Sequence, residues 1–237
     1  MAEPLAVAPR LQVTFPAAAG GNAAQSAAVP LDGGALMVGV AAPGANPASP
    51  EVWLGNRKVG TGLIGHDPVS RLVFLRIQDG TPPKGAEWLQ ETGSNIRAVL
   101  KFTDGAALAT CRSTGWIKQV GGKILPLALL QVTFDKTVPQ PGTPLLDEAG
   151  RVVAIVFQSA GAGTAYAIPA EAVHRVRQDI CGGNGQLVRG WLGLALQAES
   201  RVPQVSRVLP GSPAATAGIL PNDVLTAVGS RTVEEYA

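Results

Sequence analysis

The chain has 237 residues, of which 46% are hydrophobic and 15% are charged, and its formal net charge is +2. A charged fraction below the globular average of about 25% excludes a highly charged disordered protein, and the length suits one large domain or two modest ones. No dense run of lysine or arginine occurs, so the electrostatic footprint of a nucleic-acid binder is missing. The 29 glycines and 19 prolines favour an all-β fold of short strands and tight turns.

The first predicted strand is Leu11–Phe15, and residues 17–29 are small and nearly uncharged, which predicts a loose connection. The start of the chain, Met1 to Pro4, lacks a basic segment followed by an apolar run, so no signal peptide is visible. No stretch of about 18 apolar residues predicts a transmembrane segment.

Seven more short β-type runs follow, separated by turn residues such as Gly33-Gly34, Asp104-Gly105 and Pro141-Gly142. These predicted strands are Ala35–Val40, Glu51–Leu54, Leu72–Ile77, Ile96–Phe102, Leu129–Phe134, Arg151–Phe157 and Thr164–Ile168. One amphipathic helix is predicted at Pro169–Ile180, because apolar residues recur there every three or four positions and glycines follow.

Histidine and cysteine are scarce, which limits the chemistry available to the chain. His66 is expected in a turn and His174 on a solvated helix face, so both are interpreted as structural. Cys111 and Cys181 form no C-x-x-C pair, so no metal site and no cofactor is predicted. One disulfide between them is possible, and two separate buried thiols are at least as consistent with the sequence.

The most specific signal lies near the end of the chain. Arg189-Gly190-Trp191-Leu192-Gly193-Leu194, followed by the runs 208–215 and 217–225, resembles the opening half of a PDZ domain of the HtrA family. Members of this family join a trypsin-like double β-barrel protease to one or more PDZ domains. Three earlier segments are similar to that protease domain: His66-Asp67-Pro68 before Leu72–Leu75, Pro141–Asp147 with Gly150–Val153, and Tyr166–Pro169.

The resemblance implies an all-β trypsin-like double β-barrel followed by a partial PDZ domain, itself a β-rich α+β unit. The expected divisions are an N-terminal strand and flexible segment at 1–29, a trypsin-like (pseudo)protease domain at 30–181, a linker at 182–188 and a PDZ domain at 189–237. Thr232-Val233-Glu234-Glu235 is a capping box that predicts a helix start just before the last residue, Ala237. We therefore expect the PDZ domain to be incomplete at its C-terminus, the chain to be a fragment of a longer protein, and its peptide affinity to be weak unless it is extended.

The catalytic pattern of the family is not matched. Where the family has Gly-Asn-Ser-Gly-Gly-Pro-Leu, this chain has the shorter Gly142-Thr143-Pro144-Leu145 without a serine. Arg71 stands where the resemblance implies an aspartate, and no histidine occurs near Val40, where the general base is expected. Val40, Arg71 and Thr143 are thus predicted to be degenerate positions of a lost triad, and no catalytic residue is assigned.

The peptide-binding residues implied by the resemblance form one continuous segment. The loop before Leu194 would offer backbone N–H groups to a terminal carboxylate, and the strand Leu194–Leu196 would accept a peptide by β-augmentation. Trp191 and Leu192 are also suited to sealing the domain junction. The predicted peptide-binding residues are Gly190, Trp191, Leu192, Gly193, Leu194, Ala195 and Leu196.

The predicted function is that of an HtrA-like pseudoprotease, a non-catalytic peptide- or protein-binding or scaffolding module in protein quality control. Expected partners are extended or C-terminal peptide segments, partner proteases and further copies of the chain, and the family implies the periplasm or cell envelope. Two alternatives stay open. One is an active serine protease that uses another serine, such as Ser113, Ser159 or Ser212, and the other is a structural oligomerisation module.

Overall fold

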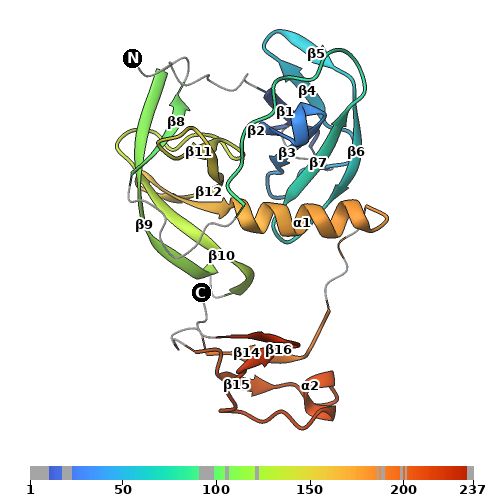
Figure 1. Cartoon of the computed structure of the whole chain (residues 1–237), viewed down its shortest axis with the longest axis vertical. Helices are drawn as coiled ribbons and strands as arrows, with labels where there is room; N and C mark the ends of the chain where they lie inside the picture. The colour runs from blue at the N-terminus through green and yellow to red at the C-terminus, as the bar shows by residue number, and fades with distance from the viewer. Residues whose placement is uncertain are drawn as a thin grey trace. The chain divides into compact units, whose positions relative to one another are not determined.

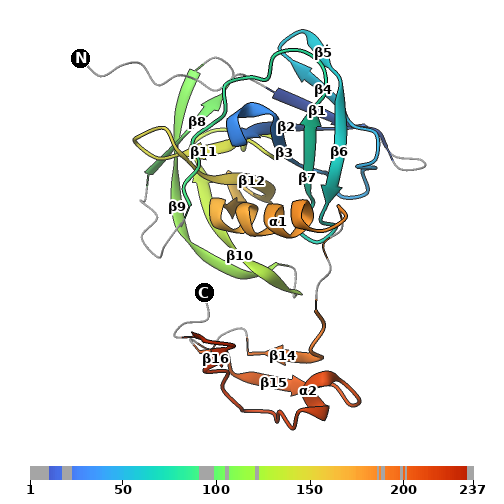
Figure 2. The ribbon, with the colours of Figure 1, turned by 45° about the vertical axis from the view of Figure 1, so that its right-hand side comes forward.

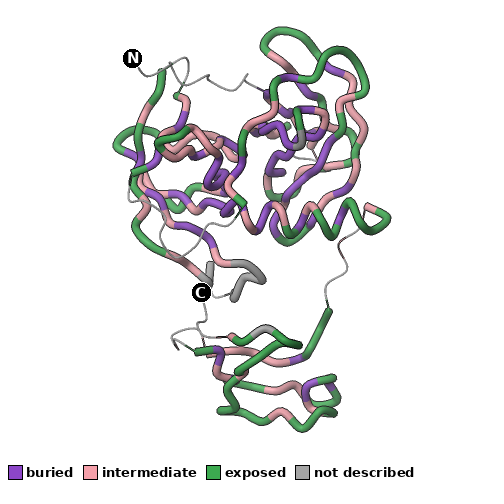
Figure 3. The backbone as a smooth tube through the Cα atoms, viewed as in Figure 1, coloured by how far each residue is buried: buried purple, intermediate pink, exposed green. Residues whose placement is uncertain are grey.

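The computed structural model describes residues 11–17, 23–90, 99–104, 107–120, 123–185, 187, 190–197, 200 and 202–233. Two compact units make up the chain: Met1–Gly115 with Leu129–Leu187, and Trp116–Ala128 with Val188–Ala237. In the first unit, buried residues are concentrated in the strands of two lobes (Figure 3).

One lobe of the first unit is a seven-stranded antiparallel sheet in the order β5-β4-β1-β2-β3-β7-β6 (Figure 1). In β1 (Leu11–Phe15) every second residue is buried, as expected for a strand with one face on a core. Those residues join Met37, Val52 and Leu75 in one hydrophobic cluster. The other strands are β2 (Ala24–Leu31), β3 (Leu36–Val40), β4 (Glu51–Leu54), β5 (Arg57–Val59), β6 (Thr61–His66) and β7 (Leu72–Ile77), and a short 3₁₀ turn spans Asp32–Gly34.

The prediction of a loose connection at residues 17–29 is wrong for its second half. Residues from Ala24 onward form β2, which pairs with β1 on one side and with β3 on the other. Its small side chains are a packing requirement, since Ser26 and Ala28 are buried inside the sheet. Low hydrophobicity therefore reflects limited space here rather than exposure.

The other lobe is a closed six-stranded barrel in the order β10-β13-β12-β11-β8-β9. Phe102 and Phe134 meet edge to face in its interior, with ring centroids 5.1 Å apart. Its strands are β8 (Val99–Asp104), β9 (Ala107–Val120), β10 (Lys123–Phe134), β11 (Pro144–Leu146), β12 (Val152–Gly161) and β13 (Thr164–Pro169). The sequence predicts four of these and misses β9 and β11, and residues 96–98 of the strand predicted at Ile96–Phe102 lie outside the described residues.

A helix and a connecting segment join the two lobes. The helix α1 (Ala170–Gly182) contacts β6 and β7 of the sheet as well as β12 and β13 of the barrel (Figure 2). Trp88, in the segment between the lobes, donates its indole N–H to the Pro30 carbonyl at 2.9 Å and is 7% exposed. The neighbouring backbone of Leu89 donates to the Val152 carbonyl at 3.0 Å.

The positions predicted for the two histidines need correction. His66 lies in β6 and pairs with Val73, not in a turn. His174 does not project from a solvated face: both ring nitrogens are buried, and its ring packs edge to face against Trp88 with centroids 5.8 Å apart. The helix is covered on that side because the inter-lobe segment crosses it, a contact that helical periodicity cannot reveal.

After residue 188, the described part of the second unit consists of two small hairpins and one turn of helix. β14 (Leu194–Leu196) has the bounds of the strand predicted to accept a peptide, and it pairs with β15 (Val205–Val208). Pro213–Thr216 forms α2, whose N-cap Ser212 accepts a hydrogen bond from the Ala215 N–H at 3.1 Å. β16 (Ala227–Val228) and β17 (Arg231–Thr232) form the second hairpin, and the helix predicted to start after Thr232 lies outside the described residues.

Replacing Trp88 by phenylalanine should lower the free energy of unfolding by about 1–2 kcal/mol, because the buried Pro30 carbonyl loses its donor. Urea denaturation followed by circular dichroism measures this loss. The half-buried Trp53 in β4 provides the control, since Trp53→Phe should change the free energy by less than about 0.5 kcal/mol. Equal losses in both variants would show that Trp88 does not join the lobes.

Candidate site between the two lobes

The turn from Pro139 to Pro144 packs directly against β2 of the sheet. The Ala27 N–H donates to the Pro141 carbonyl at 2.8 Å. The buried Ser26 hydroxyl lies 3.0 Å from the same carbonyl oxygen and 2.9 Å from that of Ala27. Gly142 makes this approach possible: its φ is +80°, and an added Cβ would lie 1.9 Å from the Ala27 carbonyl oxygen.

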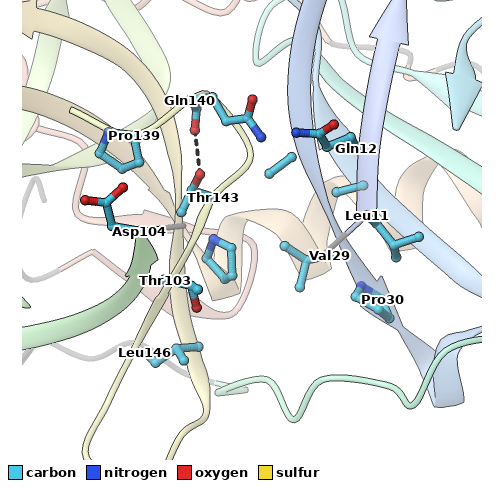
Figure 4. A pocket seen from close by; sticks show the side chains of 13 residues that line it. Leu11, Gln12, Val29, Pro30, Thr103, Asp104, Pro139, Gln140, Thr143 and Leu146 are labelled. Atoms are coloured by element: carbon cyan, nitrogen blue, oxygen red, sulfur yellow. Dashed lines mark hydrogen bonds between the residues drawn. The ribbon is translucent and has the colours of Figure 1, made fainter. Parts of the chain in front are cut away.

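This turn has few N–H groups with which to bind an anion. Pro139, Pro141 and Pro144 have no N–H. Gly142 donates to the Val156 carbonyl at 2.7 Å, and Thr143 donates to the Gln140 carbonyl at 3.3 Å. The Thr143 hydroxyl also donates to the Gln140 carbonyl, at 2.8 Å (Figure 4). The arrangement therefore lacks a pair of adjacent N–H groups that converge on one point.

Val40, the position predicted for the lost base, ends β3 and is fully buried. Its N–H donates to the Ser26 hydroxyl oxygen at 3.2 Å, so Ser26 connects the end of β3 to the turn at Pro141. The next residue, Ala41, donates its N–H to the Arg71 carbonyl at 2.8 Å. The three predicted positions thus lie on elements that hydrogen bonds join, around a serine that sequence reasoning did not single out.

Arg71 reaches from the sheet to the barrel. Its guanidinium carbon lies 4.0 Å from the centroid of the Phe157 ring, and its Nη2 donates to Gln158 Oε1 at 2.8 Å and to the Phe157 carbonyl at 3.4 Å. No carboxylate of the described residues forms an ion pair with it. Burial lowers the pKa of the guanidinium from its ordinary value, because a charge removed from water loses solvation.

The turn that precedes Arg71 determines the backbone conformation of Arg71. The Asp67 carboxylate is buried and accepts the Val69 N–H at 3.1 Å, the Ser70 N–H at 3.0 Å and the Ser70 hydroxyl. This tight turn leaves Arg71 with a φ of +58°, a left-handed conformation that costs a residue other than glycine about 1–2 kcal/mol. The contacts with Phe157 and Gln158 help to offset that strain.

A hollow of about 300 Å³ lies beside the turn, between β1 and β2 of the sheet and β8 and β11 of the barrel. Figure 4 shows Leu11, Gln12 and Val29 on one side and Thr143 and Pro139 on the other. Asp104 is the one charged residue of its lining. Neither histidine lines this hollow, so the imidazole that an acyl-transfer site requires is absent from its described lining.

The structure also shows which site residues sequence reasoning missed. Pro141, not Thr143, is the turn residue whose carbonyl bonds to β2, and Phe157 is the surface on which Arg71 rests. The Pro-x-Pro-Gly spacing at 139–142 was a visible signal for the loss of N–H donors. Nothing in the sequence signalled Ser26, because its partners lie on other strands.

Two of the serines named as alternative nucleophiles accept hydrogen bonds that stabilise local structure. Ser212 is fully buried and caps α2, and the exposed Ser159 accepts the Gly161 N–H at 3.3 Å. Ser113 lies in β9. In the described part of the chain no three histidine, cysteine or acidic residues gather as a metal site would require, and no helix is long and apolar enough to cross a membrane.

The segment predicted to bind peptide is held at its centre by Gly193. The Gly193 carbonyl accepts the Leu209 N–H at 2.7 Å, and the Leu192 carbonyl accepts the Ala214 N–H at 2.9 Å. The φ of Gly193 is +73°, and a Cβ there would lie 2.2 Å from that of Ser212. Trp191 and Leu192 are 61% and 57% exposed, and within the described residues β14 pairs on one edge alone.

Comparison with known proteins agrees with this architecture. A family model described as a PDZ domain matches residues 204–237. The probable periplasmic serine endoprotease DegP-like of Brucella suis is 27% identical over 202 residues, which cover 73% of this chain and 38% of the relative. That of Hahella chejuensis is 28% identical over 204 residues, covering 75% and 42%. The chain therefore spans about two fifths of the length of these curated relatives.

Among solved structures, the HtrA-type protease AlgW with a tripeptide superimposes with a TM-score of 0.71 at 22% identity, covering 95% of this chain and 81% of that one. The fold is that of a trypsin-like double β-barrel protease with a PDZ domain. Over most of its length the chain is similar to members of the HtrA/Do-like family.

Gly142→Ala should lower the free energy of unfolding by roughly 3 kcal/mol, since it adds a backbone clash with Ala27 to the cost of a left-handed alanine. Gly44→Ala is the matched control. Its φ is +75°, but nothing lies within 4 Å of the added Cβ, so it should cost about 1 kcal/mol. Chemical denaturation measures both values, and equal losses would contradict the close approach of the turn to β2.

The buried Cys111 thiol should make the protein less stable at alkaline pH. Burial, and secondarily the charge of Asp135, raises the pKa of Cys111 to about 12, whereas an unfolded thiol has a pKa of about 8.5. Because only the unfolded chain releases this proton, stability falls as pH rises through that window. From about pH 8 to pH 10, the parent should lose roughly 2 kcal/mol more unfolding free energy than Cys111→Ala. If denaturant titrations showed the same pH dependence of the unfolding free energy for the parent and for Cys111→Ala, this prediction would be refuted.

Proposed function

We propose that the chain is an HtrA-like pseudoprotease, which binds peptide or protein segments without cleaving them. The observation that carries the proposal is the turn from Pro139 to Pro144, where three prolines have no N–H and the N–H groups of Gly142 and Thr143 bond to carbonyls of the chain itself. A tetrahedral intermediate of peptide hydrolysis needs two convergent donors for its oxyanion. This turn does not offer them.

The activating groups are missing from the same region. A serine nucleophile needs a histidine base, and that histidine needs a carboxylate to fix its tautomer and stabilise its charged form. Val40 supplies no base, and the Arg71 guanidinium would repel an imidazolium. Loss of a triad costs about 2 × 10⁶ in kcat in the subtilisin example, which takes a typical rate of about 10 s⁻¹ to about 10⁻⁵ s⁻¹.

Arg71 also favours a binding role over catalysis. It connects the β6–β7 turn with Phe157 and Gln158 of β12 by stacking and hydrogen bonds. A cation that the fold holds in a strained backbone conformation stabilises the arrangement of the two lobes.

Peptide binding is supported by the segment Gly190 to Leu196. Its loop has a glycine with positive φ, its following strand has one unpaired edge among the described residues, and Trp191 and Leu192 are exposed beside it. An extended peptide can add to such an edge through backbone hydrogen bonds. The solved relative AlgW was obtained with a tripeptide, which is consistent with this mode.

The setting of the function follows from the relatives. Several are named as periplasmic endoproteases, so the proposal places this chain in the periplasm or cell envelope. There it would take part in protein quality control, by presenting extended or C-terminal segments to partner proteases or by assembling with further copies of itself.

The proposal is tested by measuring cleavage and binding on the same preparation. Labelled casein should show no turnover above the blank, a fluorophosphonate probe should label no serine, and Thr143→Ala should behave like the parent. Turnover that survives further purification and disappears in Thr143→Ala, or a label on Ser113, Ser159 or Ser212, would establish an active protease.

Binding is measured by the fluorescence anisotropy of a labelled peptide with a free C-terminal carboxylate. Amidation of that carboxylate should weaken binding about tenfold, because hydrogen bonds to a charged group are lost. Gly193→Ala should weaken it similarly, whereas Gly218→Ala, at another positive φ but where an added Cβ meets nothing within 4 Å, should not. Equal effects of the two variants, or no binding even by a chain extended at its C-terminus together with a stable oligomer in light scattering, would favour a purely structural module.

A further inference from the structure

A second hollow, of about 480 Å³, lies between the last turns of α1 and the seven-stranded sheet, away from the turn at Pro139 to Pro144. Arg177, Gln178 and Cys181 of α1 line one side of it. Arg76 of β7 and Leu36 of β3, which pair with each other in the sheet, line the other side.

The charged residues that line this hollow are all basic. Its two ionised side chains are arginines from separate elements, and none of the described residues that line it is acidic. Arg76 is exposed. Two guanidinium groups from separate elements, together with the Gln178 amide, suit a small ligand that carries more than one carboxylate.

A reactive group stands within the same hollow. Cys181 is an exposed free thiol, whereas the other cysteine, Cys111, is buried in the barrel. The sequence-based interpretation of two buried thiols is therefore wrong for Cys181, because the end of α1 leaves it at the surface. A ligand bound by the arginines would lie beside this sulfur atom.

We propose that the hollow of Arg76, Arg177 and Cys181 binds small carboxylate-bearing thiol compounds in their disulfide form, and that Cys181 exchanges with them. The Cys181 thiolate attacks one sulfur of the bound disulfide, and that S–S bond breaks. A mixed disulfide forms at Cys181, and the other half of the ligand leaves as a thiolate that takes up a proton. The disulfide itself is the oxidant, so no further reactant is needed.

The selectivity comes from the arginines acting on the ligand, not from activation of the thiol. Cys181 lies in the last turn of α1, at the end of the helix that carries partial negative charge. Attraction of carboxylates to two guanidinium groups raises the amount of bound disulfide. Ionic strength should therefore control the rate, since exposed charges are screened by salt.

The test compares two probe disulfides on the native full chain: glutathione disulfide, which is anionic, and cystamine, which is cationic. Intact-protein and peptide mass spectrometry follow the adduct and its position. At low salt the anionic probe should react roughly tenfold faster, with a single adduct on Cys181, and about 1 M salt should remove most of the difference. Cys111 should stay unmodified until the protein is unfolded.

Variants identify the groups responsible. In Arg76→Gln/Arg177→Gln the preference for the anionic probe should fall to about twofold or less, and Cys181→Ser should abolish the adduct. Arg112→Gln is the matched control: Arg112 is an exposed arginine of β9 that does not line the hollow, and its removal should leave the preference unchanged. Equal rates for the two probes, a preference unaltered in the double variant, or no adduct on Cys181 would overturn the proposal.

Discussion

The contact between the Pro139–Pro144 turn and β2 is the constraint on which the site depends. The Ala27 N–H and the Ser26 hydroxyl both contact the Pro141 carbonyl, and Ser26 also accepts the N–H of Val40. One buried serine thus fixes three segments that come from different parts of the chain. Because Gly142 has no Cβ, the turn lies flush against β2, and its remaining N–H groups bond within the chain.

Arg71 completes this arrangement from the opposite direction. The Asp67 turn forces it into a left-handed conformation, and the side chain then stacks on Phe157 and bonds to Gln158. A charged side chain therefore takes a structural role at Arg71, where the family resemblance implies a carboxylate.

Much of the fold could be predicted, because turn residues and β-type runs are local signals. The strands Leu11–Phe15, Glu51–Leu54 and Leu72–Ile77 have the predicted bounds, and α1 lies within about two residues of its prediction. β2 was missed because its residues are small, and a buried Ser or Ala in a crowded sheet looks like a linker. His174 was misplaced because the segment that covers it comes from outside the helix.

The sequence by itself determined the fold class and the identity of the residues at Val40, Arg71 and Thr143. It also determined the proline spacing that removes N–H donors, since a proline has no N–H in any conformation. Only the tertiary structure decided that the Pro141 carbonyl meets β2, that Arg71 meets Phe157, and that Cys181 lines one hollow with two arginines. Such contacts depend on strands and helices far apart in the chain, and their distances follow from packing, not from local residue preference.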